Sequence, residues 1–107
     1  GATFKENVTD IRNSKVFNLF NELKEFQIDV EMVDTLADKH EVMEEYGVKL
    51  SAQPNGKYDA VIVAVAHNAY KQLDENYFIS LTNSDAILVD IKNLYKTKIA
   101  TLNHWTL

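Results

Sequence analysis

The stretch "YDAVIVAVA" at residues 58–66 constrains the fold of this chain more than any other part of the sequence. It contains seven consecutive apolar residues, Ala60–Ala66, most of them β-branched or small. An unbroken apolar run of this kind predicts a strand that is covered on both faces, as in a parallel sheet. We therefore expect a parallel sheet with helices packed against it.

Helical and strand patterns alternate along the rest of the chain. The predicted helices cover residues 14–26, 39–46 and 70–82, and the predicted strands cover residues 28–34, 48–51, 86–90 and part of the tail 98–107. We expect Asn13 or Ser14 to cap the first helix, and Gly47 to end the second in a left-handed conformation. The loop "AQPNGK", with the only proline and an Asn-Gly pair, separates the two halves.

This alternation predicts an α/β fold, a three-layer, doubly wound, mostly parallel sheet of the Rossmann-like kind. Such a domain usually begins with a strand, and no strand pattern precedes the first predicted helix. We therefore expect residues 1–107 to form a single domain that lacks its first strand and comes from a longer protein.

Charge and cysteine content exclude several classes of function. The chain carries 11 basic and 16 acidic residues and no cysteine. The acidic balance argues against nucleic acid as a partner, although a few local cations can still hold the phosphates of a nucleotide. The absence of cysteine excludes disulfides, thiolate metal sites and cysteine nucleophiles within this chain, and it fits the cytoplasm. No stretch approaches the ~20 apolar residues that a membrane-spanning helix needs.

Polar side chains stand at or just beyond the ends of several predicted strands, where ligands gather in doubly wound folds. These residues are Asp34, His67, Asn68, Asp90 and Lys92. His67 could be an acid–base group in a cleft, but we favour a histidine that caps the next helix or satisfies a local carbonyl. The two aspartates do not reproduce the acidic pocket of a phosphoacceptor domain. The three histidines lack the spacing of metal ligands, so we expect no metal site.

The opening segment "GATFKENVTDIRNS" has two interpretations. Lys5 and Arg12 could bind an anion beside the first helix, Arg12 as a planar fork and Lys5 as a point charge. Alternatively, these cations pair with Glu6 and Asp10 in a polar loop, which composition alone favours.

Taken together, these segments resemble the C-terminal domain of the UDP-glucose/GDP-mannose dehydrogenase family. The opening segment is similar to the family signature G-x-x-FK-x-x-x-x-D-x-R-x-S, and "VDTLAD", "YDAVIVAVAHNAY", "ILVDIKNLY" and "HWTL" follow in the family's order. The resemblance covers essentially the whole chain. "FKENVTDIRNSK", "AVAH" and "DIKN" are most similar to the branch that oxidises UDP-N-acetylhexosamines.

The resemblance implies a nucleotide-sugar-binding domain of an enzyme that oxidises the C6 alcohol of a UDP-sugar to a carboxylate, for polysaccharide biosynthesis. It implies an N-terminal domain that binds most of the NAD, and a central region that supplies a cysteine nucleophile and forms a homodimer or larger assembly. This chain contains neither a GxGxxG motif nor a cysteine, so we expect no catalytic residue here and no activity from the chain alone.

By the same resemblance, Phe4, Lys5 and Lys92 bind the substrate and Arg12 lies beside NAD. Lys92 stands where other members carry arginine, and Asp34-Thr35 where many have Asp-Pro. The alternative is a non-catalytic, flavodoxin-like module that binds a protein partner through the acidic helix surface around residues 38–45.

Overall fold

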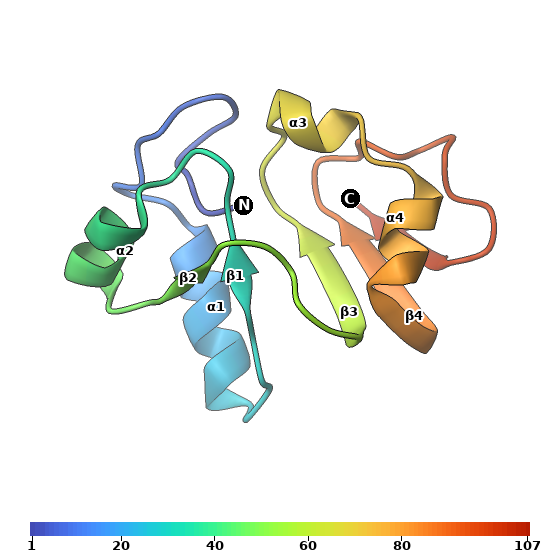
Figure 1. Ribbon diagram of the computed structural model, residues 1–107, viewed down its shortest axis with the longest axis horizontal. Coiled ribbons are helices and arrows are strands. Elements are labelled where there is room, and N and C mark those ends of the chain that lie inside the picture. The colour runs from blue at the N-terminus through green and yellow to red at the C-terminus, as the bar shows by residue number, and fades with distance from the viewer. The chain divides into compact units, whose positions relative to one another are not determined.

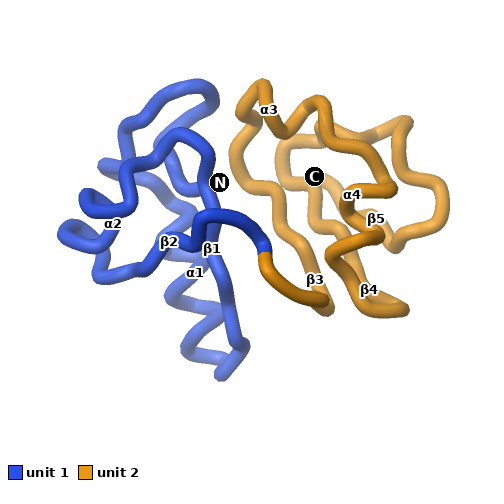
Figure 2. The backbone as a smooth tube through the Cα atoms, viewed as in Figure 1, with its two compact units in different colours: residues 1–54 blue, residues 55–107 orange.

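The computed structural model describes residues 1–107 as two compact units, residues 1–54 and residues 55–107 (Figure 2). Every pair of neighbouring strands is parallel, which confirms the predicted Rossmann-like α/β class. Hydrogen bonding divides the strands into two sheets, with orders β1-β2 and β3-β4-β5, and each lies within one unit. The units meet in sequence at Pro54, in the predicted loop, where proline offers no N–H group for pairing.

Nine elements follow one another along the chain (Figure 1). In order they are α1 (Val16–Glu25), β1 (Met32–Val33), α2 (Lys39–Tyr46), β2 (Leu50–Ser51), β3 (Tyr58–Val63), α3 (Asn68–Lys71), α4 (Glu75–Ser80), β4 (Thr82–Asp90) and β5 (Asn103–Thr106). None of the helices combines the length and the apolar character that crossing a membrane requires.

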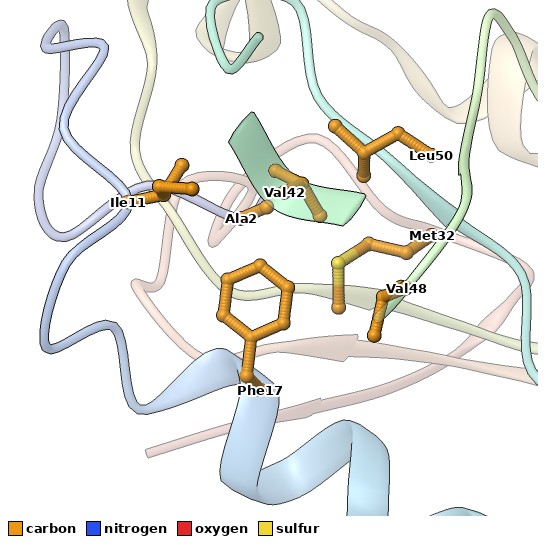
Figure 3. Packing of buried hydrophobic residues seen from close by; sticks show 7 residues of the cluster. All are labelled: Ala2, Ile11, Phe17, Met32, Val42, Val48 and Leu50. Carbon is orange, nitrogen blue, oxygen red and sulfur yellow. The ribbon is translucent and has the colours of Figure 1, made fainter. Parts of the chain in front are cut away.

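Unit 1 is built around a small apolar core that gathers side chains from α1, α2, both short strands and the opening segment. Figure 3 shows its buried members, which are Ala2, Ile11, Phe17, Met32, Val42, Val48 and Leu50. The ring of Phe17 stacks on that of Tyr46 at 3.7 Å between centroids. Gly47 ends α2 with φ 68°, and its N–H donates to the carbonyl of Met43, as the sequence predicts.

Two local predictions in unit 1 are wrong. Lys15 is the N-cap residue of α1, and no side chain caps this helix. Ser14 instead donates from Oγ to the carbonyl of Thr3 at 3.4 Å, so its hydroxyl group holds the opening segment. The strand expected over residues 28–34 is reduced to β1, because Ile28 remains 48% exposed and only Met32 is buried.

Unit 2 contains the three-stranded sheet and the long apolar run. β3 ends at Val63, and its first half is more exposed than the apolar run suggests, with Asp59 and Ala60 in solvent. The predicted helix over residues 70–82 is divided into α3 and α4, because the carboxylate of Asp74 accepts from the N–H of Tyr77 and starts a new helix. The predicted last strand is present as β5, paired with β4.

The core of unit 2 consists of Val63, Phe78, Leu88 and Tyr95. The rings of Phe78 and Tyr95 meet edge to face at 5.0 Å, and the hydroxyl group of Tyr95 donates to the carbonyl of Tyr70. Burial raises the pKa of the Tyr95 hydroxyl group. This tyrosine therefore stays protonated and fixes the segment that follows β4.

Candidate functional site

The opening segment is anchored to the core of unit 1 although it contains no regular structure. The N–H of Ala2 donates to Asp34 Oδ2 at 2.6 Å, and Tyr46 donates its hydroxyl hydrogen to the carbonyl of Ile11 at 2.6 Å. Ala2, Thr3 and Ile11 are 0%, 1% and 4% exposed. The segment therefore has a defined conformation even though most of its residues are polar.

The aromatic side chain and the cationic side chains of the opening segment are exposed to solvent. The N–H of Phe4 donates to the carbonyl of Asp10 at 2.7 Å, which closes residues 4–10 into a loop. Phe4 is 56% exposed, and Lys5 and Arg12 are exposed as well. One anchored segment thus presents an aromatic ring and two cations in solvent, where an anionic ligand can reach them.

Arg12 forms a forked pair with Asp10. Nε lies 3.1 Å from Oδ1 and Nη2 lies 3.1 Å from Oδ2, while the backbone N–H of Arg12 also donates to Oδ1. These hydrogen bonds lower the pKa of Asp10, and the same pair raises the pKa of Arg12. This is the pairing expected for a polar loop, yet a guanidinium has five N–H donors and only two are used here. The pair therefore leaves donors for a ligand.

Asp34 is a structural anchor. Its Oδ1 accepts from the N–H groups of Leu36 and Ala37 at 2.7 and 2.9 Å, and its Oδ2 accepts from Ala2. This carboxylate holds the turn after β1, which contains Thr35. Asp34 therefore holds the opening segment in place beside the turn that follows β1.

Asp90, at the end of β4, has a similar role in unit 2. Its side chain is fully buried and accepts from the N–H groups of Leu94 and Tyr95, both at 2.9 Å, and from His104 Nε2 at 3.1 Å. Lys92 lies in the turn that these bonds stabilise, and it is exposed. Phe4, Lys5 and Arg12 belong to unit 1 and Lys92 belongs to unit 2.

His67 is the N-cap residue of α3 and is only 1% exposed. Its carbonyl accepts from the N–H of Tyr70 at 2.9 Å, and its ring lies 5.1 Å from the ring of Tyr70. His67 therefore stands at the start of α3, but its side chain makes no capping hydrogen bond, so the capping role that we favoured is not found. Asn68 is the first residue of that helix. No group of three or more histidine, aspartate or glutamate side chains is arranged to hold a metal ion.

Sequence reasoning missed two contributors, Tyr46 and His104. Both are polar side chains that stabilise a turn far away in sequence, 35 and 14 residues from their partners. The residues next to Tyr46 and His104 in the sequence do not indicate that these side chains bond to distant turns. A carboxylate at the end of a strand, as at Asp90, was the only sign in the sequence that a side chain holds the following turn.

Comparisons with known proteins agree in pointing to one family. The family model described as "UDP-glucose/GDP-mannose dehydrogenase family, UDP binding domain" matches residues 1–97. The chain is 38% identical over 95 residues to UDP-N-acetyl-D-glucosamine 6-dehydrogenase of Pseudomonas aeruginosa, covering 88% of this chain and 22% of that protein. It is 37% identical over 93 residues to the protein of the same name from Salmonella typhi, covering 86% and 22%.

A solved structure shows the same fold. The UDP-N-acetyl-mannosamine dehydrogenase Cap5O from S. aureus matches with a TM-score of 0.77 at 20% identity, covering 99% of this chain and 24% of that chain. The chain spans 22% of the length of the two curated relatives compared above.

Proposed function

Since the chain belongs to the UDP-glucose/GDP-mannose dehydrogenase family, as its motifs predicted, we propose that it is the nucleotide-sugar-binding domain of an NAD-dependent UDP-sugar 6-dehydrogenase. We propose a UDP-N-acetylhexosamine as the substrate, because the names of the relatives given above specify UDP-N-acetylglucosamine or UDP-N-acetylmannosamine. The parent enzyme would oxidise the C6 alcohol to a carboxylate in the cytoplasm, for polysaccharide biosynthesis, as a homodimer or a larger assembly.

The observation that carries this proposal is the anchored opening segment. A binding loop must hold its side chains in place before the ligand arrives, because ordering them on binding costs free energy. Residues 2, 3 and 11 are buried while Phe4, Lys5 and Arg12 stay exposed. This arrangement supports the proposal of a preformed binding loop.

Each residue has a proposed role. Lys5 neutralises the charge of the UDP pyrophosphate, and Phe4 packs beside the ligand. Lys92 makes a further substrate contact, and as a lysine it does so as a point charge without the forked geometry of arginine. Arg12 faces the cofactor side, where its unused guanidinium donors suit the phosphates of NAD.

The role of this chain in the reaction is binding and positioning. NAD, when bound to the parent enzyme, supplies the hydride acceptor. The residues of this chain hold the substrate anion and orient the sugar for reaction at C6. The chain has no cysteine, so a covalent step through a thiolate would require a cysteine from another part of the parent enzyme.

Calorimetric titration tests this function. The full chain is titrated with UDP-N-acetylglucosamine, UDP, GDP and NAD, and the titrations are repeated with Lys5→Ala. We expect weak binding of UDP and of the UDP-sugar. A charged hydrogen bond contributes roughly 1.5 kcal/mol, so Lys5→Ala should raise Kd about tenfold.

The matched control is Lys49→Ala, which removes an exposed lysine of the same unit outside the opening segment. This variant should bind UDP like the wild type. Equal weakening by both substitutions would contradict a specific role for Lys5, and no binding of UDP or UDP-sugar at millimolar concentration would contradict the proposed function.

A further inference from the structure

The turn after β4 is held by side chains that lie outside the proposed binding residues. β4 ends at Asp90, and the N–H of Asn93 donates back to the carbonyl of Asp90 at 3.1 Å. Asn93 has φ 55°, in the left-handed region that asparagine tolerates better than most residues. This tight turn brings the N–H groups of Leu94 and Tyr95 to the Asp90 carboxylate, with Lys92 exposed within the turn.

The last strand supplies the third hydrogen bond to this carboxylate. His104 pairs in register with Leu88 of β4, so it lies on the same face of the sheet as Asp90, two residues farther along. Its Nε2 is 3.1 Å from Asp90 Oδ2, and its side chain is 16% exposed. A carboxylate only accepts hydrogen bonds, so Nε2 carries the hydrogen and donates it.

The other end of the turn is fixed by packing. Tyr95 is fully buried against Phe78, and its hydroxyl group bonds to the carbonyl of Tyr70. The backbone around Lys92 is thus held from both sides, by a buried carboxylate at one end and a buried aromatic ring at the other. A fixed backbone lowers the entropy that a lysine loses when it contacts a ligand.

We propose that Asp90 and His104 are positioning residues that hold the turn carrying Lys92 in the geometry needed to bind the nucleotide-sugar. This inference rests on the proposed function and extends it to the end of the chain. His104 lies beyond residues 1–97, which the family model matches, so the contribution of β5 follows from the geometry of this chain.

The test compares two His104 variants for binding of UDP-N-acetylglucosamine to the full chain. His104→Leu removes the donor, and we expect it to raise Kd about fivefold. His104→Gln places an amide N–H near the position of Nε2, and we expect it to restore Kd to within about twofold of the wild type. A fivefold rise in Kd corresponds to a loss of about 1 kcal/mol in binding free energy.

A double-variant cycle with Lys92→Ala separates positioning from general stability. If His104 acts through Lys92, His104→Leu should weaken binding in the wild-type background and have no further effect in the Lys92→Ala background. A residue that only stabilises the fold would weaken binding equally in both backgrounds, and that result would overturn the inference.

Thr106→Val is the matched control. Thr106 lies on the same face of β5 as His104 and pairs with Asp90, and its buried Oγ1 has no hydrogen-bond partner. Removing this oxygen should leave Kd unchanged. A loss like that of His104→Leu would show that any change in β5 disturbs binding, and it would overturn the specific role of His104.

Circular dichroism establishes that each variant is folded. If His104→Leu is unfolded, His104→Asn replaces it, because its shorter amide is polar but does not reach Asp90. A folded His104 variant that lacks the donor but binds like the wild type would overturn this inference. If Lys5→Ala still weakens binding in that case, the proposed function stands. A wild-type chain that does not bind UDP-N-acetylglucosamine overturns this inference together with the proposed function.

Discussion

Replacing Tyr46 with phenylalanine isolates the hydrogen bond that fixes the opening segment to α2. The substitution removes only the hydroxyl group, which donates to the carbonyl of Ile11 at 2.6 Å. The ring can keep its stack on Phe17, with centroids 3.7 Å apart and an interplanar angle of 7°. The loss therefore consists of one hydrogen bond, without the cost of a cavity.

The expected magnitude follows from this geometry. A typical intramolecular hydrogen bond contributes about 1 kcal/mol net, and the cost increases when the remaining partner is left in a buried site. Ile11 is 4% exposed, so we expect Tyr46→Phe to lower the free energy of unfolding by about 1–2 kcal/mol.

Urea denaturation followed by circular dichroism measures this loss, and amide hydrogen exchange locates it. Exchange should accelerate at residues 4–12 and stay unchanged in unit 2. Tyr46→Leu is the comparison, because it also removes the ring stack and should cost more. A loss below about 0.3 kcal/mol with unchanged exchange at residues 4–12 would refute the claim that Tyr46 anchors the segment.

Three further predictions concern stability. Hydrogen bonds from the backbone N–H groups of residues 100–102 lower the pKa of Glu75 below its ordinary value of about 4.5. Ionised Glu75 therefore stabilises the fold above that ordinary value, and the effect is lost as the pH falls through the lowered pKa. Glu75→Gln should flatten the loss of stability in this acid range, and an unchanged pH dependence would argue against this anchor. Gly47→Ala should cost about 1–2 kcal/mol in urea denaturation because φ is 68°, whereas Gly56→Ala, which meets no neighbouring atom, should be near neutral. Phe17→Ala, at a 1% exposed site, should cost about 3–5 kcal/mol in thermal unfolding, while Phe26→Ala, at a 78% exposed site, should cost little; similar losses would contradict the described core.

The α/β class was predictable from sequence because it depends on short-range patterns. The apolar run at residues 60–66, the helical spacing before Phe26 and the glycine at position 47 each express a local preference of the backbone. The run forms β3 as far as Val63, the spacing forms α1, and Gly47 ends α2. The division into two sheets was not predictable from these local patterns. Strand pairing depends on which strands come together in space, and residue types alone do not specify this.

The candidate site was predictable only in part. The motif identified Phe4, Lys5, Arg12 and Lys92 as binding residues, and that assignment remains a prediction. The carboxylates of Asp34 and Asp90 looked like ligand groups because they stand at the ends of predicted strands, whereas their oxygens accept from backbone N–H groups. Such hydrogen bonds depend on the path of the turn, which residue types alone do not specify.

The central claim is that the anchored opening segment binds the nucleotide-sugar. Nuclear magnetic resonance titration of the ¹⁵N-labelled full chain with UDP-N-acetylglucosamine tests it most directly, residue by residue. We predict saturable shifts of the amide signals of residues 4–12 and of the turn around Lys92, with the signals of α2 unchanged. Saturable shifts confined to the acidic surface of α2, or no shifts at millimolar ligand, would contradict the account.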